Sequence, residues 1–137
     1  MTYLEILWFA VSIAGFAAWL AIVAGKRETG SAALAATLGA IFLAYTLFQI
    51  GQEGVVGFFT NHTANLTGLQ VWWDLIMSVL VALFLIAPRA RRVGMNVPAW
   101  AALVGLTASI GLLAMCARLF WLERESEVAR APNPARA

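Results

Sequence analysis

Polar side chains inside long apolar stretches are the places where this sequence could do chemistry. Ser12, Tyr45 and Asp74 each lie in such a stretch, and a rise of about 1.5 Å per helical residue places all three roughly 20 Å from one end of the helices. A carboxylate deep in a bilayer costs about 2.5 to 3.5 kcal/mol on insertion scales, so Asp74 must face other helices and find a donor. We therefore predict a hydrogen bond to Asp74 from Tyr45 or Ser12.

A second polar layer is predicted about 10 Å further along the same helices. Glu5, Glu53 and Arg118 lie roughly 30 to 33 Å from the reference end, with Gln49 one turn below Glu53. An Arg and a Glu at the edge of a bilayer can pair and still reach water, so we interpret this layer as a structural tie. Both layers together supply the candidate binding residues, which are Ser12, Tyr45, Gln49, Glu53, Asp74 and Arg118.

The composition excludes several other kinds of site. The chain has one Cys and one His, which cannot supply a disulfide or the three or four protein ligands of zinc and iron–sulfur centres. It also has no Asp-rich motif of the kind that magnesium-dependent prenyl-diphosphate chemistry needs. We predict no metal, no cofactor and no nucleic-acid partner.

Membrane helices must position these residues. Of the 137 residues, 62% are hydrophobic and 12% are charged, whereas an ordinary soluble domain has about 25% charged residues. The mean hydropathy is +0.83. Four spans of about 20 residues use most of this length, so the sequence predicts an all-α integral membrane bundle of four antiparallel transmembrane helices.

The boundaries of the spans follow from helix start and stop signals. Ser31 is placed to cap the second helix, Pro88 to end the third and Pro98 to open the fourth. The predicted spans are 3–25, 31–52, 69–87 and 98–122. We expect an interfacial loop over 51–69, one domain over 1–127 and a flexible polar tail over 128–137.

The basic residues predict the orientation of this bundle, because short cytoplasmic loops retain Lys and Arg. The loops after the first and third spans hold five of the nine basic residues, namely Lys26, Arg27, Arg89, Arg91 and Arg92. The other four fall on the opposite side, three of them in the tail beyond Glu123. We predict a multi-pass protein of the cell inner membrane with both termini outside.

Two stripes of small residues indicate close helix contacts. Ala32, Ala36, Ala40 and Ala44 recur every fourth residue on the second helix, and Ala101, Gly105 and Ser109 do so on the fourth. Membrane helices associate through such close approaches. We interpret the stripes as contacts within the bundle, and the alternative is the face of a homo-oligomer.

Short motifs in the second half of the chain resemble a known family. In order they are Phe58-Phe59, Ala64-Asn65, Asp74-Leu75 and Arg91-Arg92-Val93-Gly94-Met95. They are similar to a family of small bacterial membrane proteins called domain of unknown function 2834, with the likeness running from about Phe58 to Leu122. The resemblance implies a bacterial membrane protein, and it carries over no activity or functional residue.

Two classes of function fit these observations. We predict a binding or accessory protein of the lipid bilayer, such as a subunit, a chaperone or a binder of a small ligand or lipid. The alternative is a membrane-embedded enzyme that acts on a lipid or isoprenoid, with Asp74 or Glu53 as the acid.

Overall fold

The computed structural model describes residues 2–25 and 30–130, and these form helices with short connections and no strand. The predicted all-helical class is confirmed. Contacts between residues divide the chain into two units, Met1–Gly30 and Ser31–Ala137. The predicted tail beyond Arg130 and the loop residues 26–29 lie outside the described residues.

The first unit contains one helix, α1 (Tyr3–Val23), which matches the predicted first span to within two residues. A capping box begins it. The Glu5 amide donates to Thr2 Oγ1 at 3.3 Å, and the Thr2 amide donates to Glu5 Oε2 at 2.8 Å. These bonds satisfy two amides that have no partner within the helix. Glu5, predicted to face Arg118, therefore serves the cap of its own helix.

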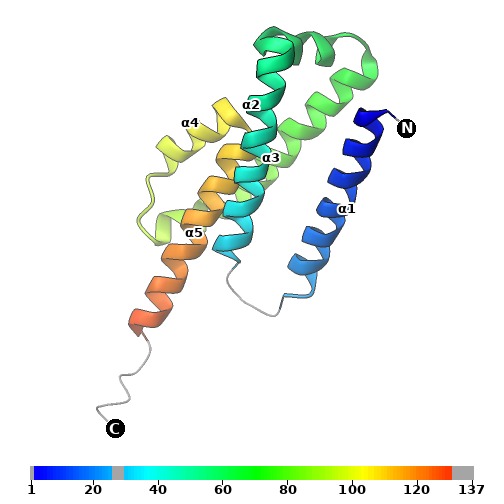
Figure 1. The fold of residues 1–137 in the computed structure, drawn as a ribbon. Helices are drawn as coiled ribbons and strands as arrows, with labels where there is room; N and C mark the ends of the chain where they lie inside the picture. The colour runs from blue at the N-terminus through cyan, green and yellow to red at the C-terminus, as the bar shows by residue number, and fades with distance from the viewer. Residues whose placement is uncertain (1, 26–29, 131–137) are drawn as a thin grey trace. The chain divides into compact units, whose positions relative to one another are not determined.

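In the second unit, α2 (Ala32–Thr63) begins as predicted, because the Leu34 amide donates to Ser31 Oγ at 3.2 Å. Gly54, with φ 74° and ψ 167°, divides the helix into two limbs. The first limb ends near the predicted boundary at residue 52. The second limb makes 55–63 helical, where we expected an interfacial loop, and it leads sideways toward the start of the next helix (Figure 1).

The backbone at Gly54 predicts opposite effects for two Gly→Ala substitutions. A side chain is strained at the positive φ of Gly54, so Gly54→Ala should lower the free energy of unfolding by about 1 to 2 kcal/mol. Gly51 has helical φ and open space around it, so Gly51→Ala should raise the free energy of unfolding by about 0.5 to 1 kcal/mol. Unfolding of both variants in detergent measures these effects. Equal shifts in one direction would contradict the strain at Gly54.

Helix α3 (Leu66–Arg92) is longer at both ends than the predicted third span. Asn65 caps it, with Oδ1 accepting from the Gly68 amide at 2.8 Å. The prediction that Pro88 ends the helix is wrong, because the helix continues to Arg92. A proline removes only one backbone hydrogen bond, and the tertiary contacts of the residues after Pro88 keep them helical. Gly94, with φ 76°, provides the actual stop, where the Met95 amide donates to the Ala90 carbonyl at 3.0 Å.

The predicted fourth span is two helices, α4 (Val97–Thr107) and α5 (Ser109–Arg130). Asn96 caps α4, which begins at Val97, one residue before Pro98, so the predicted start is correct. The chain then reverses at Ala108, whose φ of 47° and ψ of −119° are not helical. Figure 1 shows α4 rising toward this turn and α5 descending from it, so the two helices form an antiparallel hairpin.

The core of the second unit lies where this hairpin packs on the end of α3. Val104, Met115 and Leu119 are its largest fully buried side chains. Helix α2 runs antiparallel to α5 along its side (Figure 1). The buried cluster consists of Ile86, Ala90, Met95, Val97, Val104, Met115 and Leu119.

Three helical segments among the described residues are long and apolar enough to cross a membrane. They are Tyr3–Val23, Ala32–Gly57 and Leu66–Arg92. Val97–Thr107 is apolar but shorter. At a rise of about 1.5 Å per residue, its 11 residues extend about 16 Å, roughly half of a bilayer core.

Candidate functional site

An ion pair between α3 and α5 is the strongest polar contact of the second unit. Arg89 Nε donates to Glu123 Oε1 at 2.9 Å, and Arg89 Nη2 donates to Glu123 Oε2 at 2.6 Å. The two side chains are 31% and 15% exposed. A planar guanidinium that meets a carboxylate through two parallel bonds fixes the orientation of both groups, and partial burial weakens the competition from water.

Aromatic packing supports this pair. The Arg89 guanidinium carbon lies 5.6 Å from the centre of the Phe120 ring, within the range of a cation–π contact. Phe120 and Cys116 are half-buried against the core. The contacts hold the last turn of α3 beside the second half of α5, so these two segments lie at the same end of the second unit.

Arg118 does not meet Glu53. Its guanidinium carbon lies 5.3 Å from the centre of the Trp121 ring, one turn further along α5. Gly39 of α2 contacts Leu113 of α5, since a Cβ at Gly39 would lie 3.3 Å from the Leu113 Cβ. Glu53 lies 14 residues beyond Gly39 on α2, and Arg118 lies 5 residues beyond Leu113 on α5. Because the two helices are antiparallel, these steps lead in opposite directions and separate the two residues by roughly 28 Å. The predicted tie between them is wrong because α5 runs the other way.

The other residues of the predicted outer layer bond within their own helices. Gln49 Nε2 donates to Glu53 Oε2 at 3.3 Å, a pair one turn apart on α2. Glu5 lies in the first unit, whose placement against the second is not described, so a contact of Glu5 with Arg118 stays a prediction.

Within the second unit, the predicted deep layer is not joined by hydrogen bonds. Ser12 belongs to the first unit, so a contact of Ser12 with Asp74 stays a prediction. Ser12 Oγ donates to the Trp8 carbonyl at 2.8 Å, within α1. Tyr45 and Asp74 lie on α2 and α3, and both are exposed in the second unit. No hydrogen bond or ion pair of the described residues involves Asp74. The predicted bond from Tyr45 to Asp74 is therefore not observed.

Within the second unit, the stripes of small residues do not lie at the contacts between helices. Helix α2 meets α5 through Ala35, which is buried, and Gly39, whereas Ala36, Ala40 and Ala44 are exposed. In the second stripe, the turn at Ala108 separates Ser109 from Ala101 and Gly105. That stripe therefore cannot form one helix face. The alternative, in which small residues form the face of a homo-oligomer, stays a prediction.

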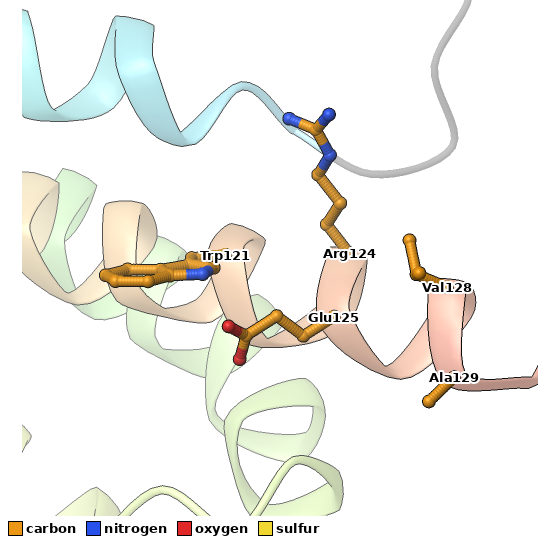
Figure 2. A pocket seen from close by; sticks show the side chains of 5 residues that line it. All are labelled: Trp121, Arg124, Glu125, Val128 and Ala129. Atoms are coloured by element: carbon orange, nitrogen blue, oxygen red, sulfur yellow. The ribbon is translucent and has the colours of Figure 1, made fainter.

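A shallow hollow of about 360 Å³ lies on the second half of α5. Figure 2 shows Trp121 and Glu125 beside it, with the Arg124 side chain extending toward the start of α2. Val128 and Ala129 complete the lining. Within the part of the chain that the structure describes, no three His, Cys, Asp or Glu side chains gather as a metal ion would need.

Sequence reasoning missed the Arg89–Glu123 pair because it assigned the two residues to opposite sides of a membrane. One signal could have revealed the turn between α4 and α5. Gly105, Thr107, Ala108, Ser109 and Gly111 are small or weakly helix-forming residues within seven positions of the predicted fourth span. Such a cluster at the middle of an apolar stretch is where a chain can reverse.

Comparisons with known proteins give no family for the chain. No family model, no curated protein and no solved structure matches it. The resemblance to domain of unknown function 2834 therefore stays a prediction.

Proposed function

We propose that this chain is an integral protein of a bacterial inner membrane, with its N-terminus outside, that acts as a binding or accessory subunit. The three apolar helical segments support insertion into a bilayer. Their surfaces are mostly large apolar side chains, such as Phe84, which is 81% exposed, and Val81. In water such a surface would aggregate, whereas in a membrane it faces lipid or another helix.

Exposed Asp74 is the observation that carries the binding role. It lies eight residues after Leu66, about 12 Å into α3, on a helix whose next charged residue is Arg89. A carboxylate that faces lipid at this depth is costly, and such residues normally face other helices and pair there. We infer that a helix of a partner protein covers Asp74 and donates a hydrogen bond to it.

The enzyme alternative is less well supported by the placement of the acids. An enzyme that used Asp74 or Glu53 as its acid would hold the substrate in a pocket beside that carboxylate. The hollow on α5 is at the end of the second unit where α3 finishes, whereas Asp74 lies near the beginning of α3. The hollow on α5 is therefore not the substrate pocket of an enzyme that uses either of these acids.

Substitutions at Asp74 test this function in the native membrane protein. The chain would be purified with an affinity tag in mild detergent, and bound proteins and lipids identified by mass spectrometry. Asp74→Asn keeps a hydrogen-bonding side chain and should retain a stoichiometric protein partner. Asp74→Leu should reduce its retention about five- to thirty-fold, the range for one hydrogen bond between membrane helices in model peptides.

Ser78→Leu is the matched control, because Ser78 is exposed one turn further along α3 and carries no charge. It should leave partner retention unchanged. Equal loss with Ser78→Leu, or full retention with Asp74→Leu, would contradict a role for the carboxylate. Recovery of one tightly bound lipid and no protein would favour the enzyme alternative.

A further inference from the structure

We propose that α4 and α5 form a re-entrant hairpin, which enters the membrane and returns to the same side. We further propose that the arginine-rich end created in this way binds the headgroups of anionic phospholipids in that leaflet. This inference rests on the membrane insertion proposed above but not on a partner at Asp74. It replaces the predicted outside position of the C-terminus.

The geometry of the hairpin is the first support. Helix α4 is half as long as α5, with 11 residues against 22, and α5 carries the chain back to the last turn of α3. The Arg89–Glu123 pair joins the two ends there. Because α4 starts from the same end, a span across the whole membrane between Val97 and Glu123 would separate the two partners of this pair.

Several polar groups at the turn of the hairpin have hydrogen-bond partners. Non-helical backbone at membrane depth is tolerated where its polar groups have partners and other protein covers it. The Ala108 amide donates to the Val104 carbonyl at 2.7 Å, and the Leu112 amide donates to the Ala108 carbonyl at 3.0 Å. Thr107 Oγ1 donates to the Leu103 carbonyl at 2.7 Å.

The distribution of basic residues is an independent support. The sequence has nine Lys and Arg, and none of them lies in 1–25, 28–88 or 93–117. With four complete spans they divide five to four across the membrane. With three spans and a re-entrant hairpin, all nine belong to segments on one side, as expected when short cytoplasmic segments retain the basic residues.

Several exposed arginines lie toward this end of the second unit, and guanidinium groups suit phosphate. Arg91, Arg92, Arg118 and Arg124 are exposed, while Arg89 is neutralised by its pair. Exposed acids at the same end are Glu125 and Glu127, both further along α5 than Arg118. Arg118 is therefore the charged residue of α5 that lies nearest the membrane centre.

Arg118 indicates the depth of the headgroups. It precedes Glu123 by five residues, so its backbone lies about 7 to 8 Å closer to the membrane centre than the ion pair. Its guanidinium extends toward the C-terminal end of α5, over the Trp121 ring, which is 54% exposed. A long cation that reaches outward and a partly exposed Trp are both typical of the interface between lipid tails and headgroups. An anionic phospholipid fits this combination of apolar and positive surface.

Labelling of single cysteines tests the hairpin. In a Cys116→Ala background, cysteines would be introduced at Gly30, Thr67 and Ala129, all of which are exposed. With an impermeant thiol reagent on intact cells, Thr67→Cys should react, whereas Gly30→Cys and Ala129→Cys should react only after lysis. Ala129→Cys that reacts together with Thr67→Cys would show four spans and overturn the hairpin. Reaction of all three in a chain that alkaline carbonate extracts would instead overturn membrane insertion.

Lipid retention tests the arginine surface. The full-length chain would be reconstituted with equal phosphatidylglycerol and phosphatidylcholine, and the lipids that stay bound measured by native mass spectrometry. Phosphatidylglycerol should be preferred, and Arg91→Gln with Arg92→Gln should reduce the preference by about five-fold per arginine. The matched control, Glu125→Gln with Glu127→Gln, should leave the preference the same or raise it. Equal retention of both lipids by the wild type, or an equal decrease in both double variants, would overturn headgroup binding.

Discussion

Substitution of Gly111 by leucine is expected to lower the free energy of unfolding by about 3 kcal/mol. A Cβ at Gly111 would lie 2.6 Å from Thr107 Oγ1 and 2.9 Å from the Leu103 carbonyl oxygen. The second contact is with the backbone of α4, which cannot rotate away as a flexible side chain can. A leucine must therefore push α4 and α5 apart, and Met115 and Leu119 would lose their packing partners.

Gly105→Leu is the matched control for this prediction. Gly105 lies on α4, six residues earlier, and a Cβ there would meet nothing within 4 Å. It is exposed, so the same change in side chain should alter the free energy of unfolding by less than about 1 kcal/mol. Denaturation of the wild type and both variants in the same detergent provides the measurement. If the two leucines had equal effects, α4 and α5 would not pack as closely as the structure has them.

Removal of the Glu123 carboxylate is the second change with a large expected effect. Glu123→Gln leaves the Arg89 guanidinium partly buried without its counter-charge, which should lower the free energy of unfolding by about 1 to 3 kcal/mol. If the pair were fully buried, the decrease in the free energy of unfolding would be larger, as it is for ion pairs in protein interiors. Since the Arg89 side chain is 31% exposed, water compensates for part of the loss.

A double-mutant cycle separates the pair from its surroundings. Arg89→Leu with Glu123→Leu removes both charges and should be more stable than either single leucine variant, because no isolated charge remains. Glu127→Gln, one turn later on α5 and exposed, is the control and should have little effect. Additive effects of the two leucines would mean that Arg89 and Glu123 do not interact in solution.

Much of the helical architecture could be predicted from the sequence because its signals are local. The apolar run from Tyr3 predicts α1, and the hydroxyl of Ser31 predicts the start of α2, because each depends on a few consecutive residues. Pro98 likewise marks the start of α4. The end of α3 was predicted wrongly at Pro88. The tendency of Pro88 to end a helix is local, and it was outweighed by the tertiary packing of Ala90, which is buried two residues later.

The candidate site could be predicted less well because it depends on the direction of each helix. The sequence by itself determined that the chain is helical and apolar, and it showed which few polar residues lie inside the apolar segments. The tertiary structure alone decided which of those residues meet. One turn at Ala108 reverses α5, brings Glu123 to Arg89 and moves Arg118 away from Glu53. Pairing depends on separation in space, and a single reversal within an apolar run changes that separation without changing composition or hydropathy.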